Sequence, residues 1–288
     1  MDRARRARCS CIRKCTAKAR NANPHLVNTS QGMLAYSSIG PSDSLEKIVL
    51  LHGFTQAKEL WHSTASLLAN DLAGRAPHII SVDLPGHGGS SAQEVNLWQA
   101  AQQIVELCGE ATYIGYSLGA RIALHCALQS PNSVKRLVLC GATPGLRSNE
   151  EREARRVADE NIAQNIEQTP LAEFLNTWTR QAIFDGYVPD ETDISIRLKN
   201  NPSGLAQSLR KMGTGTQEDL WNRLSELSMP VLLVTGDDDH KFSNIAVEMK
   251  ALIGPAAQHA HIPQCGHSVP FQKPAEFCSV VSQFILLR

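Results

Sequence analysis

Residues 115–119 read Gly-Tyr-Ser-Leu-Gly and fit the G-x-S-x-G pattern of a nucleophile elbow. An apolar run precedes this pentapeptide and a helical pattern follows it. Small residues at both ends permit a sharp turn that lifts the serine oxygen above a sheet. The simpler interpretation is a tight strand-to-helix turn with an incidental serine. The strand–turn–helix context favours catalysis, so Ser117 is the candidate catalytic serine.

A serine hydroxyl reacts only when a partner removes its proton, and that partner is usually a histidine oriented by an acid. The chain order expected after such an elbow is serine, acid, histidine. Asp239 stands just past an apolar run at 231–235, and His267 follows the last expected strand. We expect the neighbouring Asp237 and Asp238 to face solvent, and no further ligands suggest a cation site. The predicted triad is Ser117, Asp239 and His267.

Backbone donors are expected beside this serine. His52-Gly53-Phe54 follows the first core strand. In such a site the N–H groups of Phe54 and Leu118 form an oxyanion hole, which stabilises negative charge on a reacting oxygen. We interpret His52, next to the turn, as structural rather than as a proton carrier.

Arg121 lies four residues after Ser117, one turn along the expected helix, so its side chain should point towards the same site as Ser117. The rest of that helix offers apolar side chains to the core. A buried guanidinium needs an anionic partner, because leaving its charge unpaired is costly. The partner is either an internal carboxylate or a substrate carboxylate held by two parallel hydrogen bonds. This residue alone leaves both partners open.

Short apolar runs alternate with helical patterns, which predicts an α/β fold with a mostly parallel sheet covered on both faces. We expect strands at 48–52, 78–82, 111–114, 134–140, 231–235 and 259–263, and an edge hairpin within 25–38. A helix should occupy 118–129. The closing segment from Pro274 places five apolar residues on one helical stripe: Phe277, Val280, Val281, Phe284 and Ile285.

The alternation of expected strands and helices stops between Gly141 and Met229, where no strand is expected. Ser148-Asn-Glu-Glu151 is a capping box that opens a charged helix, and further helical patterns lie around 170–182 and 203–212. Ligands of open α/β sheets bind at the carboxyl ends of the strands, so helices inserted here would close the site. We predict a core formed by 25–146 and 213–288 and a helical cap over 147–212.

The formal net charge of zero conceals a basic leader and an acidic body. Residues 1–24 hold eight Lys+Arg and one acid, which leaves 20 Lys+Arg against 27 Asp+Glu, a net charge of −7, for residues 25–288. A body this acidic repels phosphate backbones, so nucleic acid is not an expected partner. No apolar run approaches the roughly 18 residues of a membrane span.

The leader lacks the apolar segment of a secretory signal. It is compatible with an organelle transit peptide, but a disordered extension or an over-long start is simpler. Cys9, Cys11 and Cys15 lack a fourth ligand at a suitable spacing, so zinc is not expected. The other five cysteines are interpreted as buried reduced thiols. We expect a cytoplasmic monomer or weak oligomer, or an organelle protein if the leader is a transit peptide.

With these residues in view, the chain resembles the 2-succinyl-6-hydroxy-2,4-cyclohexadiene-1-carboxylate synthases of menaquinone and phylloquinone biosynthesis, which have the α/β-hydrolase fold. The similarity covers about residues 47–288. Asn200-Asn-Pro-Ser-Gly-Leu205, leading into Ser208-Leu-Arg-Lys-Met-Gly-Thr-Gly215, is its most specific part. Other matching segments are 51–54, 83–90, 115–119 with Arg121, 144–146, 236–239, 241–242 and 266–267. Departures are Ala120, where the family has glycine, and Val269-Pro270 after the histidine.

The resemblance implies a carbon–oxygen lyase that uses no metal and no organic cofactor. Its substrate would be a small tricarboxylate, 2-succinyl-5-enolpyruvyl-6-hydroxy-3-cyclohexene-1-carboxylate. Proton removal from the ring would start an elimination that expels pyruvate and leaves a conjugated diene. Ser117, tuned by His267 and Asp239, would take the proton.

By motif position, the resemblance also implies five substrate-binding residues: Arg121, Arg155, Arg197, Tyr116 and Trp178. Arg155 lies among other charged residues of the first cap helix, and an exposed ion-paired helix face explains it as well. Arg197 carries the same alternative. Trp178 has another role open to it, which is to pack the cap against the core.

Two other functions stay open. A carboxylesterase or C–C-bond hydrolase would use the same triad through an acyl-serine, and the three arginines count against it. A non-catalytic receptor or scaffold would use the fold alone, and the complete triad counts against that.

Overall fold

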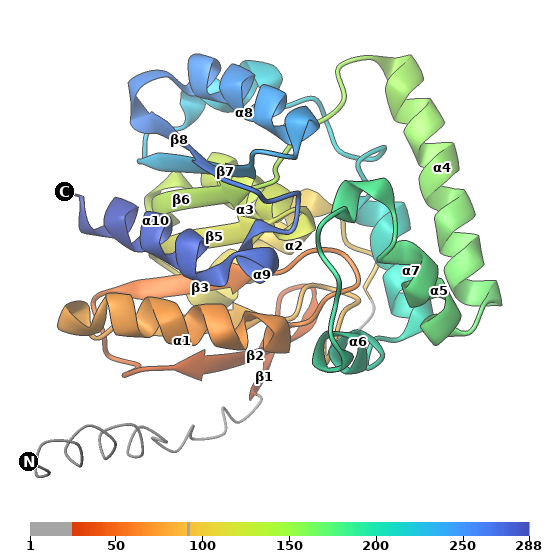
Figure 1. Cartoon of the computed structure of the whole chain (residues 1–288), viewed down its shortest axis with the longest axis horizontal. Helices are drawn as coiled ribbons and strands as arrows, with labels where there is room; N and C mark the ends of the chain where they lie inside the picture. The colour runs from red at the N-terminus through yellow and green to blue at the C-terminus, as the bar shows by residue number, and fades with distance from the viewer. Residues whose placement is uncertain (1–24, 91–92, 288) are drawn as a thin grey trace, which may run out of the picture.

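The computed structural model describes residues 25–90 and 93–287. Its centre is an eight-stranded sheet with helices on both faces, and a separate group of helices lies beside the sheet (Figure 1). The basic leader, with Cys9, Cys11 and Cys15, lies outside the described residues. The five cysteines of the body are all free and buried, as predicted. No helix in the described ranges is long and apolar enough to cross a bilayer.

The strand order in the sheet is β1-β2-β4-β3-β5-β6-β7-β8. The β1–β2 and β2–β4 pairs are antiparallel and the remaining pairs are parallel. The predicted fold class is confirmed, including the hairpin at the edge. The bounds are β1 (His25–Thr29), β2 (Gly32–Ile39), β3 (Lys47–Leu51), β4 (His78–Val82), β5 (Ala111–Tyr116), β6 (Val134–Cys140), β7 (Val231–Gly236) and β8 (Ala257–Ile262).

Helices bury both faces of the sheet, which is why β4, β5 and β7 are buried at every residue and read as continuous apolar runs. One face is covered by α1 (His62–Asp71) and α10 (Pro274–Leu286), and the other by α2 (Leu97–Cys108), α3 (Leu118–Gln129) and α8 (His240–Ile253) (Figure 1). The predicted stripe of α10 faces the sheet, because Phe277, Val281 and Ile285 are fully buried there.

Four helices between β6 and β7 form the cap: α4 (Asn149–Gln168), α5 (Leu171–Trp178), α6 (Glu191–Arg197) and α7 (Pro202–Met212). The predicted capping box begins α4, since Ser148 Oγ accepts from the N–H of Glu151 at 3.0 Å. The long helix α4 runs beside α7 (Figure 1). Apolar residues of α4, α5 and α7 make a small core of the cap, against which Phe54 and Trp178 also pack. The short helix α6 was not predicted.

Candidate active site

Ser117 occupies the tight turn between β5 and α3, with φ 51° and ψ −108°. A non-glycine residue held there stores about 1–3 kcal/mol of backbone strain, which the surrounding structure must offset. The Ser117 N–H donates to Cys140 O at 2.9 Å, and this bond ties the turn to β6. A Cβ atom on Gly119 would lie 2.2 Å from Leu51 O, so the last glycine of the pattern is required by close packing.

Asp239 and His267 form the second half of the predicted triad. Nδ1 of His267 lies 2.7 Å from Oδ2 of Asp239, and the other carboxylate oxygen accepts from the N–H of Phe242 at the start of α8. Asp237 and Asp238 are exposed. Because Asp239 holds a proton on Nδ1, the Nε2 atom carries the free lone pair.

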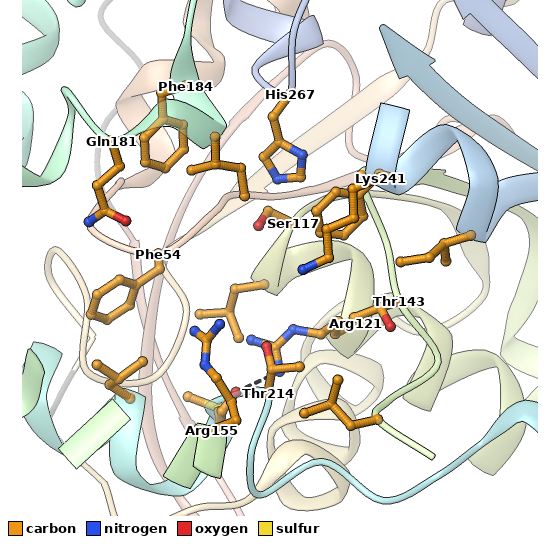
Figure 2. Close-up of a pocket in the computed structure, with 18 of the residues that line it drawn as sticks. Phe54, Ser117, Arg121, Thr143, Arg155, Gln181, Phe184, Thr214, Lys241 and His267 are labelled. Carbon is orange, nitrogen blue, oxygen red and sulfur yellow. Dashed lines mark hydrogen bonds between the residues drawn. The ribbon is translucent and has the colours of Figure 1, made fainter. Parts of the chain in front are cut away.

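Nε2 of His267 is buried and has no hydrogen-bond partner within the described residues. His267 and Ser117 line the same cavity, and Figure 2 shows both side chains facing it. An imidazole whose Nε2 has no other partner and which shares a cavity with a serine is placed to remove the proton of that serine.

Gly141, which follows β6, packs against the imidazole of His267. Its φ is +61°, and a Cβ atom there would lie 2.5 Å from Cε1 of His267. We expect Gly141→Ala to push the ring out of line and to lower kcat about 100-fold, since small misplacements of reacting groups cost that much. Steady-state kinetics together with the thermal unfolding midpoint would test this. A correctly folded variant with unchanged kcat would contradict it.

Phe54 and Leu118 both line the cavity. Neither N–H has a hydrogen-bond acceptor among the described residues, although the neighbouring Ser117 and Gly119 amides are both paired. Two unpaired donors at the start of α3 and in the loop after β3 are what an oxyanion site requires. Their location agrees with the sequence-based prediction, and their role stays a prediction.

His52 is fully buried and both ring nitrogens are used by the backbone. The N–H of Leu84 donates to Nε2 at 3.1 Å, so Nδ1 carries the proton and donates to Gly53 O at 2.8 Å. Burial lowers the pKa of His52 to about 3. This histidine is therefore neutral and structural, and it fixes the loop after β3 to the loop after β4.

Buried neutral histidines predict acid sensitivity of the whole fold. Burial lowers the pKa values of His52, His87 and His125 to about 3, 3 and 4. Between pH 6.5 and about 4 the unfolded chain binds protons that the native state does not, so stability falls as pH falls, by about 1.4 kcal/mol per pH unit per histidine. We expect a lower urea midpoint at pH 5.5 than at pH 7.5.

His87→Asn should weaken this pH dependence, because one of the histidines with a depressed pKa is removed. The exposed His62→Asn variant is the matched control and should leave the dependence unchanged. Equal urea midpoints of the parent protein at the two pH values would refute the prediction.

The cavity between the core and the cap has a volume of about 290 Å³, near the lower end of the range for small-molecule sites. Its wall combines aromatic and aliphatic side chains with a few polar groups. The polar side chains that line it are Ser117, Arg121, Thr143, Arg155, Gln181, Ser208, Thr214, Lys241 and His267. Three of these are cationic, and no Asp or Glu of the described residues lines the wall.

Arg121 is buried, and its guanidinium donates to two neutral acceptors, Met212 O at 2.7 Å and Oε1 of Gln217 at 3.3 Å. Burial lowers its pKa to about 10, which leaves it charged at neutral pH. No carboxylate within the described residues forms an ion pair with it. Of the two partners considered from the sequence, an internal carboxylate in ion-pair contact is therefore absent from the described residues, although Asp159 is near enough to raise the pKa of Arg121 against the effect of burial.

Arg155 and Trp178 also line the cavity. The guanidinium of Arg155 is paired with Asp159 at 2.7 Å but remains partly exposed. Trp178 packs edge-on against Phe54, and its buried indole N–H has no partner among the described residues. Both residues thus reach the cavity and also make the structural contacts considered as alternatives.

Arg197 and Tyr116 are not among the residues that line the cavity. Arg197 is buried between Asp193 and Thr55. The Tyr116 hydroxyl lies 3.1 Å from Ser268 Oγ, and its ring lies 5.4 Å from that of His267. The Tyr116 ring therefore contacts the predicted triad histidine without lining the cavity.

Several residues at the site were not singled out from the sequence. Lys241 stands two positions after Asp239 and points into the cavity (Figure 2). That spacing, on the first turn of the helix after the acid, was the signal that could have found it. Gln217 and Thr55 do not line the cavity; they bond to Arg121 and Arg197, and their positions in the sequence offer no such signal. No group of three or more metal-binding side chains occurs in the described ranges.

The comparisons with known proteins agree with this geometry. Residues 47–274 match the family model of the alpha/beta hydrolase fold. The chain is 34% identical, over 90% of its length and 97% of the other, to a Bacillus subtilis (strain 168) protein whose name as a 2-succinyl-6-hydroxy-2,4-cyclohexadiene-1-carboxylate synthase is provisional. It is 30% identical, over 84% and 92%, to the synthase of that name from Enterobacter sp. (strain 638).

A solved structure of MenH from S. aureus superimposes with a TM-score of 0.79 at 28% identity, covering 89% of this chain and 98% of that one. Sequence and structure thus point to the same relatives. The chain belongs to the α/β-hydrolase fold family and, within it, to the enzymes named 2-succinyl-6-hydroxy-2,4-cyclohexadiene-1-carboxylate synthases.

Proposed function

We propose that this enzyme eliminates pyruvate from 2-succinyl-5-enolpyruvyl-6-hydroxy-3-cyclohexene-1-carboxylate and leaves 2-succinyl-6-hydroxy-2,4-cyclohexadiene-1-carboxylate, a step of menaquinone or phylloquinone biosynthesis. The observation that carries the proposal is the charge of the cavity wall. Arg121, Arg155 and Lys241 converge on it, and no carboxylate of the described residues lines it (Figure 2). A site of this kind favours a substrate with several carboxylates.

The proposed chemistry is a proton abstraction followed by an elimination. Nε2 of His267 takes the hydroxyl proton of Ser117, and Ser117 Oγ takes the proton from the ring carbon. The electron pair left on carbon 2 forms a double bond to carbon 3, the existing ring double bond moves to carbons 4 and 5, and the bond between carbon 5 and the enolpyruvyl oxygen breaks. The leaving group takes up the proton held by His267 and departs as pyruvate, which returns His267 to its starting state.

Negative charge builds up on a substrate oxygen as the proton leaves. The free N–H groups of Phe54 and Leu118 would stabilise that charge, together with the positive end of α3. Arg121 and Lys241 would hold carboxylates of the substrate, and Phe54, Trp178 and Phe184 would exclude water from the ring. No step in this scheme calls for a metal or an organic cofactor.

The proposal is tested by supplying the enolpyruvyl precursor and following pyruvate and diene absorbance together, with no cofactor added. We expect both to appear at the same rate. Simple aryl esters serve as the comparison, because an acyl-enzyme hydrolase would turn them over. Rapid ester hydrolysis without pyruvate release would contradict the proposal and favour the hydrolase, and a protein inert towards both would favour the non-catalytic alternative.

A further inference from the structure

The loop that carries Phe54 is anchored on the core at both ends. At its start, His52 binds the N–H of Leu84. At its end, the buried Lys58 donates to Asp83 through its backbone N–H and its ammonium group, each at 2.7 Å. The core therefore fixes where the loop begins and ends. Between these ends, Oε1 of Gln56 accepts from the N–H of Gly53 at 2.8 Å and the ring of Phe54 contacts that of His87.

The centre of the loop is a tight turn with an unusual residue at its third position. Gln56 N donates to Gly53 O at 3.2 Å, which closes a β-turn over Phe54 and Thr55. Thr55 has φ 68°, a conformation that this turn position normally fills with glycine. For a β-branched residue this conformation is a genuine outlier. A threonine there costs strain, so its side chain must make a contact that offsets it.

That contact comes from the cap. Nη1 of Arg197, at the end of α6, donates to Thr55 Oγ1 at 2.6 Å. Nδ2 of Asn200, three residues later, donates to Thr55 O at 2.8 Å. Both oxygens of Thr55 are therefore held by one short segment of the cap, and Thr55 itself has no exposed surface.

Arg197 is itself fixed in place. Its Nε donates to Oδ1 of Asp193 one helical turn earlier, and Oδ2 of Asp193 accepts from Tyr187. The Arg197 side chain is buried, and it is not among the residues that line the cavity. Its guanidinium is thus bonded to Asp193 and Thr55.

We infer that Arg197 is a positioning residue that acts through Thr55. It holds the turn in its left-handed conformation and so aims the adjacent Phe54 N–H into the site. The oxyanion donor on the core is then in place only when the α6 segment of the cap is seated. This inference rests on the role proposed for the Phe54 amide and deepens it, but it does not depend on which substrate the enzyme takes.

The test uses a neutral alkyl fluorophosphonate on the full-length chain. Ser117 Oγ forms a bond to phosphorus, fluoride leaves, and the serine proton passes to His267, so the rate reports the triad and the oxyanion donors. The probe carries no carboxylate. A residue that only binds substrate carboxylates would leave its rate unchanged, whereas a residue that positions the Phe54 amide would change it.

We expect Thr55→Val, which keeps the shape and removes the acceptor, to slow labelling about 10- to 100-fold, since one oxyanion donor is worth up to about 1,000-fold. Arg197→Met should slow it similarly, and the double variant should be no slower than the slower single variant.

Thr55→Gly, which adopts φ 68° without strain, should label faster than Thr55→Val. Arg210→Met, which removes cap ion pairs away from the cavity, is the control and should label at the parent rate.

Arg197→Met also leaves Asp193 without its cation, so Thr55→Val is the decisive variant if the former does not fold. Labelling of Thr55→Val at the parent rate would overturn the inference. So would multiplicative losses in the double variant, or a loss on Arg197→Met confined to the KM of a carboxylated substrate. If the parent protein labels as expected but releases no pyruvate, the proposed substrate is wrong and the positioning role stands.

Discussion

Replacing Ser117 by alanine is expected to lower kcat for pyruvate release about 1,000-fold, within the range that a positioned general base contributes. KM should change little, because the carboxylate-binding cations remain in place. The turn itself should survive, since alanine keeps the backbone bonds of Ser117 to Cys140 and Arg121. Coupled spectrophotometric measurement of pyruvate, with a thermal unfolding midpoint, gives both quantities.

Ser63→Ala removes an exposed hydroxyl on α1, far from the cavity, and serves as the matched control. It should behave as the parent protein. A Ser117→Ala variant that folds and retains kcat would remove the serine from the mechanism, and His267 would then have to act on the substrate directly.

Arg121→Met is expected to lower kcat/KM for the tricarboxylate about 100-fold or more, because a buried charge pair with the substrate is worth about 2–5 kcal/mol. The reason lies in the partners of Arg121. Met212 O and Gln217 Oε1 orient the guanidinium without neutralising it, so its charge is free for a substrate carboxylate. Steady-state kinetics with the tricarboxylate and with a neutral aryl ester, if one is turned over, separate binding of the anion from damage to the triad.

Gln217→Glu tests the same idea from the other side. The new carboxylate would form an ion pair with Arg121. We expect kcat/KM to fall about 10-fold, because this ion pair competes with the substrate carboxylate for the guanidinium. It also loses the bond from Gln217 Nε2 to Thr143 O, so Gln217→Met, which loses that bond without adding charge, is the control. If Gln217→Glu and Gln217→Met lower kcat/KM equally, an added negative charge beside Arg121 has no effect, and the prediction is wrong.

The triad and the sheet could be predicted because their signals are local. Ser117 and Asp239 each follow a strand that is buried along its length, His267 follows the last strand, and parallel strands deliver such residues to one edge. Arg121 could be predicted from helical spacing alone. The elbow, the edge hairpin and the capping box of α4 all depend on residues within a few positions of one another.

What the sequence did not reveal depends on distant contacts. Thr55 and Arg197 are 142 residues apart, and Arg121 and Gln217 are 96 apart, so no periodicity links them. Helix α6 has only seven residues, too few for a pattern to stand out. The positive φ of Thr55 could not be predicted, because the residue that favours it is glycine and the threonine is held there by the cap.

The most direct test of the account is a single turnover with enzyme in excess over the tricarboxylate, in which pyruvate, diene absorbance and the intact mass of the protein are followed together. We predict that pyruvate and diene form in equal amounts with one rate constant while the mass of the enzyme stays unchanged, as expected if Ser117 only carries a proton. A mass increase located on Ser117, or diene formation without an equal amount of pyruvate, would contradict it.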